Sequence, residues 1–135
     1  MSIIDTANQN QQFLNFMEVF FEVQQKLQVM HYKTKNYNKH QIIGEFLEKI
    51  QESADNYIEI AISLGFNIPD SALDDHPTIF KVYDPKSLLQ KYMFFLLKHK
   101  EFLLKAKGFS TVALEAELDS IFISLNKTVF KLGMD

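Results

Sequence analysis

Four side chains of the kind that binds metals lie in one stretch of the chain, between His31 and Glu59. His31 and His40 flank a short polar segment, and Asp55 and Glu59 follow His40 after fifteen and nineteen residues. Imidazole suits iron and zinc, and carboxylates suit hard divalent cations. A spacing of four residues puts the two carboxylates on one face of a helix. The combination predicts a redox-active metal site, provided that the fold brings the four side chains together.

The hydrophobic pattern predicts four long amphipathic helices that would position these residues. Apolar side chains recur every three or four residues over residues 6–32, 38–64, 85–107 and 111–132. Capping signals mark the helix starts: Thr6 with Gln9, Asn38 with Gln41, Asp84 before Pro85, and Ser110 or Thr111. Glycines that can adopt a left-handed conformation are expected to end the last three helices: Gly65, Gly108 and Gly133.

The lengths of the connections predict how the helices are arranged. Residues 33–39 and the segment around Gly108 are short, so each is expected to join an antiparallel pair of helices. Residues 66–84 are long enough to cross the bundle, and their prolines exclude a continuous helix. Short, long and short connections are typical of a ferritin-like bundle. We therefore predict an all-α, ferritin-like four-helix bundle, in which residues 1–135 form a single domain.

The order of the two histidines and the two acids resembles a motif of the mini-ferritins, the DNA-binding proteins from starved cells. In that family a histidine ends the first helix, a second opens the next, and Asp-x-x-x-Glu follows fifteen residues later, as from His40 to Asp55. The segments HYKTKNYNKH from His31 and NKTVFKL from Asn126 also resemble small, largely uncharacterised ferritin-like proteins of phages and large DNA viruses. The resemblance covers residues 25–65 well and the last helix loosely.

This resemblance implies an iron site that two copies of the chain share. In mini-ferritins the residues matching His31 and His40 come from one subunit, and those matching Asp55 and Glu59 come from its two-fold mate. They bind Fe(II), which peroxide or oxygen oxidises, and the Fe(III) product mineralises inside a dodecameric shell. The implied partner is thus a second copy, with these four residues as ligands. The chain differs from typical members in carrying Tyr32 where they have Trp, a shorter interval between the histidines, and no lysine-rich extension.

Other polar residues of the predicted helices have simpler interpretations. Asp55 and Glu59 share their stripe with two further glutamates, as on an ordinary solvated helix face. His99 and Glu117 fall on the apolar faces of the third and fourth helices. Buried polar groups need partners, so we expect a structural His99–Glu117 hydrogen bond there rather than a metal site. In the long connection, the Asp-Asp-His run at residues 74–76 is interpreted as turn chemistry.

Composition narrows the class of protein. A formal net charge of −3 without a basic arm argues against nucleic acid as a partner. The lack of cysteine excludes thiolate metal sites and fits a reducing compartment. There is no signal-peptide pattern and no apolar run long enough to span a bilayer, so we expect a cytoplasmic protein that does not enter membranes.

Two functions are compatible with these observations. The resemblance favours an iron-binding protein that oxidises Fe(II), for iron storage or for protection from peroxide. The alternative is a non-catalytic ferritin-like bundle that acts as a structural or interaction protein. The resemblance to viral proteins makes a viral origin compatible with this alternative.

Overall fold

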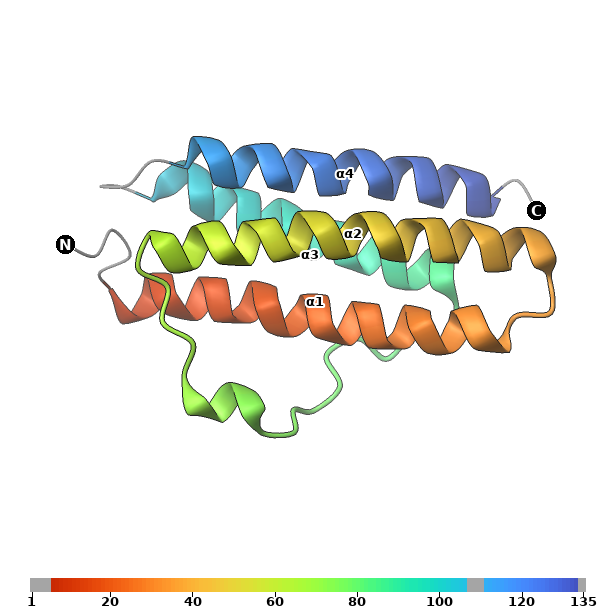
Figure 1. Cartoon of the computed structure of the whole chain (residues 1–135), viewed down its shortest axis with the longest axis horizontal. Helices are drawn as coiled ribbons and strands as arrows, with labels where there is room; N and C mark the ends of the chain where they lie inside the picture. Colours follow the sequence, from red (N-terminus) through yellow and green to blue (C-terminus); the bar gives the residue numbers. More distant parts are fainter. Residues whose placement is uncertain (1–5, 107–110, 134–135) are drawn as a thin grey trace.

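The computed structural model describes residues 6–106 and 111–133, which form a bundle of four α-helices (Figure 1). One short 3-10 helix lies in the long connection. The helices are α1 (Ala7–Lys33), α2 (Tyr37–Ser63), α3 (Pro85–Lys105) and α4 (Val112–Gly133), and the 3-10 helix η1 is Asp70–Leu73. The predicted all-helical class and the four-helix bundle are confirmed. Over these same residues, no helix is both long and apolar enough to cross a bilayer.

The four helices pack as a square in which each helix packs mainly against two others. α1 packs against α2 and α3, and α4 packs against α2 and α3. Each helix runs antiparallel to both of its neighbours (Figure 1). Consequently α1 lies diagonally opposite α4, and α2 lies diagonally opposite α3. The connection from α2 to α3 returns the chain from one end of the bundle to the other, passing outside α1 (Figure 1).

Three helix boundaries lie where their capping signals predict. The Thr6 hydroxyl accepts from the backbone N–H of Gln9, whose side chain accepts from the Thr6 N–H, which is a capping box. Asp84 caps α3 by accepting from the Ser87 N–H, and this bond lowers the pKa of the Asp84 carboxyl. Gly65 follows α2 with a φ of 115°, a backbone conformation that costs little only for glycine.

The start of α2 differs from the prediction. Asn36, not Asn38, is the cap, because its side chain accepts from the Lys39 N–H. The connection from α1 is therefore only residues 34–36, and the Thr34 hydroxyl accepts from the Asn36 N–H within it. Two signals at the other tight connection, Gly108 and Ser110, lie outside the described residues, whereas Thr111 directly precedes α4.

The core is dense in aromatic side chains at its centre. Phe13 and Phe16 of α1 are buried against Tyr57 of α2 and His99 of α3. The ring of Phe16 stacks on that of Tyr57, with centroids 4.0 Å apart and planes 25° apart. Such pairs contribute about 0.5–1.5 kcal/mol beyond the burial of their area. The centre of the bundle is thus filled by packed rings, and the predicted ligands lie elsewhere.

Candidate metal centre

The structure brings His31 and His40 into direct contact. His31 lies near the end of α1 and His40 in the first turn of α2, and residues 34–36 fold one helix end back beside the other. Their imidazole rings stack with centroids 3.8 Å apart and planes 17° apart. Both side chains are half-buried, so one edge of the pair faces solvent. The short connection therefore assembles two of the four predicted ligands within one chain.

Each imidazole is oriented by the backbone of the other histidine. His31 Nδ1 lies 2.9 Å from the carbonyl oxygen of His40, and His40 Nδ1 lies 2.8 Å from that of His31. A carbonyl oxygen only accepts, so each Nδ1 must carry the proton and donate it. In the neutral imidazole, Nε2 then keeps its lone pair. A histidine whose Nδ1–H is held by a carbonyl presents Nε2 as a metal ligand in a fixed orientation.

The exchanged bonds also stabilise the turn. The carbonyl of His31 belongs to the last turn of α1, where backbone oxygens have no intrahelical donor. The His40 ring supplies that donor. A pair that caps a helix end has a structural role without any metal.

Gly44 makes room for the histidine pair. Within residues 6–106 and 111–133 it is the one glycine in a helix interior, where glycine costs about 1 kcal/mol relative to alanine. A Cβ atom at this position would lie 3.0 Å from Cε1 of His31. The sequence therefore contained a sign that position 44 is special, because a helix-breaking residue lies there within a long amphipathic pattern.

We expect Gly44→Ala to disturb the His31 ring while leaving the bundle folded. Alanine favours the helix, but its methyl group would push the His31 imidazole aside and weaken the Nδ1–H bond to His40. In ¹⁵N-detected imidazole spectra, the signals of the Nδ1–H tautomer should shift or broaden at both histidines. Gly133→Ala is the matched control, because a Cβ there meets only the flexible end of Lys86, at 3.5 Å. Identical imidazole spectra for wild type and Gly44→Ala would contradict the role given to Gly44.

Asp55 and Glu59 do not approach the histidine pair within one chain. Both are exposed on the outer flank of α2. At about 1.5 Å per residue, about 22 Å of helix separates His40 from Asp55. No group of three or more His, Asp or Glu side chains that could hold a metal exists within residues 6–106 and 111–133. One copy thus supplies two imidazoles at one place and two carboxylates at another.

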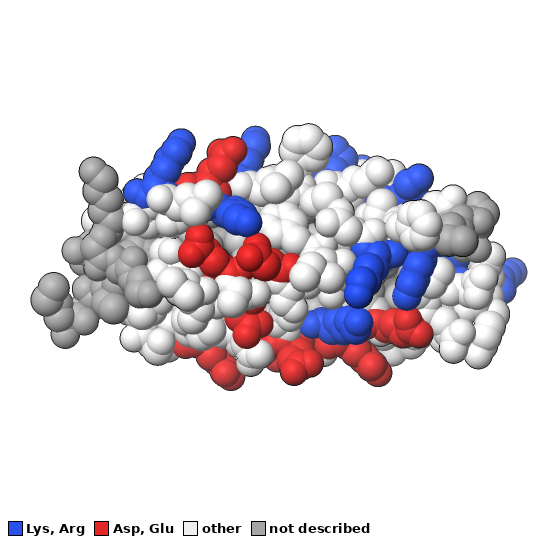
Figure 2. All heavy atoms as spheres, turned by 90° about the horizontal axis from the view of Figure 1, so that it is seen from above, with Lys and Arg blue, Asp and Glu red and all other residues white. Residues whose placement is uncertain are grey.

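The two carboxylates belong to a longer acidic row. α2 carries acidic residues at intervals of three and four, which form one stripe, and all are exposed: Glu45, Glu48, Glu52, Asp55 and Glu59. The stripe starts beside the histidine pair, since Glu45 and Glu48 line the same shallow hollow as His31 and His40. Viewed from above, acidic side chains follow the lower edge of the molecule and gather left of its middle, and lysines lie near them at the upper left and on the right (Figure 2). The flank of α2 therefore attracts cations along most of its length.

The expected His99–Glu117 hydrogen bond is wrong. His99 is buried and its Nε2 bonds the Tyr57 hydroxyl across the bundle, from α3 to the diagonally opposite α2. Glu117 instead lies near the surface, where one carboxylate oxygen is 3.5 Å from the Asn56 amide. Burial lowers the pKa of His99 from 6.5 to about 4, so the ring is neutral at pH 7. The sequence did not identify Tyr57 as the partner of His99, because Tyr57 fits the hydrophobic pattern of α2 like any other core residue.

The acidic run of the crossover forms no metal cluster with its neighbours. Asp74 ends η1, with its backbone N–H bonded to the Ser71 carbonyl, as expected of turn chemistry. His76 Nε2 lies 3.8 Å from a Glu18 carboxylate oxygen, an exposed contact between the crossover and α1.

Comparison with known proteins found no relative of this chain. No protein-family model, no curated protein and no solved structure matches the chain. The chemistry of the site is therefore argued from its own residues.

Proposed function

We propose that the protein binds and oxidises Fe(II) at a site shared by two copies, in the manner of a mini-ferritin. His31 and His40 of one copy and Asp55 and Glu59 of the other would be the ligands. The observation that carries the proposal is the histidine pair, whose Nδ1 atoms lie against carbonyl oxygens, which leaves Nε2 as the nitrogen that would bind a metal. The antiparallel square of helices and the long crossover agree with a ferritin-like bundle.

The proposal requires a definite arrangement of the two copies. A two-fold axis makes each contact occur twice, so His40 meets the partner's carboxylates at both ends of the interface. The axis must then cross α2 near Glu48, midway between His40 and the Asp55–Glu59 pair. The acidic rows of the two copies face each other there, and like charges in proximity repel. Bound cations would offset this repulsion, which links assembly to the presence of iron.

Each ligand type has its own part in the reaction. The imidazoles would hold Fe(II), for which nitrogen ligands are suitable, and the carboxylates would stabilise the harder Fe(III) product. Each Fe(II) loses one electron. Two such electrons, with two protons, reduce one molecule of hydrogen peroxide to two of water. The product would either be stored or leave, which gives iron storage or protection from peroxide as the outcome.

Mixing two inactive variants tests the shared site. His31→Ala/His40→Ala and Asp55→Asn/Glu59→Gln should each oxidise Fe(II) no faster than buffer does. Each protein is loaded with Fe(II) under anaerobic conditions and then exposed to peroxide, and the ferric absorbance is followed. After unfolding and refolding together in equal amounts, half the dimers should contain one intact site of two, giving about a quarter of the wild-type rate. Glu45→Gln/Glu52→Gln removes the same charge from the same stripe and should retain most activity.

Three results would overturn the proposal. One is a ferric absorbance rise in either variant equal to that of wild type. Another is a chain that stays monomeric by light scattering at every concentration and iron loading. The third is failure of the mixed sample to regain activity although it contains mixed dimers, which would exclude sharing between copies.

A second candidate is a structural or interaction protein. It is favoured by apolar side chains on the outer faces of α3 and α4, of which Phe94, Leu104 and Phe130 are 70%, 65% and 69% exposed. Exposed apolar side chains that form one contiguous patch are typical of contact surfaces. Such a protein would assemble equally well without iron and would give the same buffer-level oxidation as both variants.

A further inference from the structure

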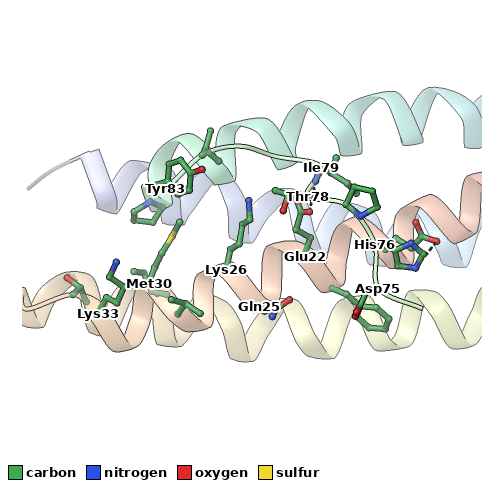
Figure 3. A pocket seen from close by; sticks show the side chains of 18 of the residues that line it. Glu22, Gln25, Lys26, Met30, Lys33, Asp75, His76, Thr78, Ile79 and Tyr83 are labelled. Carbon is green, nitrogen blue, oxygen red and sulfur yellow. Dashed lines mark hydrogen bonds and ion pairs between the residues drawn. The ribbon is translucent and has the colours of Figure 1, made fainter. Parts of the chain in front are cut away.

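The crossover and the outer side of α1 border a half-open cavity of about 820 Å³ (Figure 3). Its floor is α1, its roof is the crossover from Ala72 to Pro85, and the start of α2 closes one end. Apolar side chains from floor and roof line it between its two ends: Phe21, Val29, Met30, Ile79 and Val82. A cavity of this size with a largely apolar lining is characteristic of sites for small organic ligands.

Polar contacts hold the roof at a fixed position over α1. The Glu22 carboxylate accepts from the backbone N–H groups of Ile79 and Phe80, at 2.6 and 2.8 Å. Lys26 donates to the carbonyl oxygen of Phe80. The charged groups in the middle of the cavity therefore have backbone partners already, and a ligand meets mainly the apolar side chains between them.

The two ends of the cavity have opposite charge. Lys33 lies at one end near Met30 and Tyr83, whereas Asp75 and His76 lie at the other (Figure 3). Lys39 also lines the cavity, from the first turn of α2. Within the described part of the chain, the ammonium groups of Lys33 and Lys39 have no ion pair and no hydrogen bond. The acidic end contains Glu18, Asp74 and Asp75. An anionic group is therefore attracted to the lysine end and repelled by the other.

We propose that this cavity binds a single-chain fatty acid. Its carboxylate binds Lys33 and Lys39, and its alkyl chain runs under the crossover along Val29 and Ile79 towards Phe21. From Lys33 to Phe21, α1 rises about 18 Å, which matches an extended chain of ordinary length. Burial of the alkyl chain supplies most of the affinity, and the charged end fixes its direction. The site involves none of the proposed iron ligands.

Fluorescence of cis-parinarate measures this binding on the metal-free protein. We expect saturable uptake of one molecule per chain, reversed by myristate. Lys33→Ala/Lys39→Ala should weaken myristate binding about tenfold or more, since charge-assisted hydrogen bonds are lost, and leave 1-tetradecanol unchanged. Lys91→Ala/Lys98→Ala, on the exposed face of α3, removes the same charge and should have no effect. Val29→Trp, at a half-exposed position, should fill the cavity and weaken both ligands without unfolding the protein.

Any of four outcomes overturns the fatty-acid site. The first is that no saturable binding is seen, and the second is that the lysine variant binds myristate as tightly as wild type. The third is that tetradecylamine binds more tightly than myristate. The fourth is that the protein binds phosphatidylglycerol vesicles but not free myristate. Because the assay contains no iron, it is independent of the result of the oxidation experiments.

Discussion

Between pH 6.5 and pH 4, the free energy of unfolding should fall by about 3 kcal/mol because of His99 alone. Burial lowers its pKa to about 4 in the folded protein, against 6.5 as the ordinary value. In this range the unfolded chain binds a proton that the folded chain does not, so acid favours unfolding. The contribution is fully present above pH 6.5 and is lost as the pH falls towards 4. Urea unfolding at a series of pH values measures it.

Variants of the Tyr57–His99 pair isolate this effect. Tyr57→Phe/His99→Leu replaces both partners by apolar groups and should have a much flatter stability profile between pH 6.5 and 4. His99→Leu alone should be equally flat but less stable at pH 7, because it leaves the Tyr57 hydroxyl buried without a partner. His76→Ala, at an exposed site, should retain the wild-type slope. An unchanged slope in both His99 variants would show that another group causes the acid sensitivity.

Helix ends were predictable where one local signal had no competitor. Thr6 with Gln9, and Asp84 with Pro85, each offer a single favourable start, and the structure uses both. Asn36 and Asn38 are two asparagines two residues apart, and only Asn38 has a glutamine three residues later. The choice between them depends on how closely α1 and α2 approach, and the tertiary structure favours Asn36.

Partners across the core were harder to predict than the burial of single residues. The hydrophobic period correctly places His99 on the buried face of α3. It does not say which helices face one another, and the sequence neighbours α3 and α4 suggested Glu117. In the folded bundle α2 and α3 are diagonal, and only a long side chain such as Tyr57 reaches His99 across that distance.

The sequence predicted that the two histidines lie near each other, but it did not predict how their rings are oriented. The turn between α1 and α2 follows from the loss of hydrophobic period after Tyr32, and it places His31 near His40. The stacking of the rings and the exchange of bonds with carbonyls depend on the exact pairing of two helix ends. Whether Asp55 and Glu59 join them depends on a second copy, which lies beyond the fold of a single chain.

Replacing Tyr92 by phenylalanine should stabilise the protein, by about 1–3 kcal/mol. Tyr92 is completely buried, and its hydroxyl has no hydrogen-bond partner in the part of the chain that the structure describes. This burial raises its pKa far above the ordinary value. Folding thus removes the hydroxyl from water and gives no bond in return, whereas phenylalanine keeps the packed ring without that cost.

The same substitution at Tyr57 should have the opposite sign, which makes the two a matched pair. Tyr57 is equally buried, but its hydroxyl bonds His99, so Tyr57→Phe leaves an imidazole nitrogen unpaired and should destabilise the protein by about 1–3 kcal/mol. Urea unfolding at pH 7 compares the two variants with wild type. Loss of stability in Tyr92→Phe as large as in Tyr57→Phe would mean that the Tyr92 hydroxyl has a partner, for which a buried water molecule is the simplest candidate. The sign of the Tyr92→Phe effect therefore decides whether the buried Tyr92 hydroxyl is without a partner or is bonded to buried water.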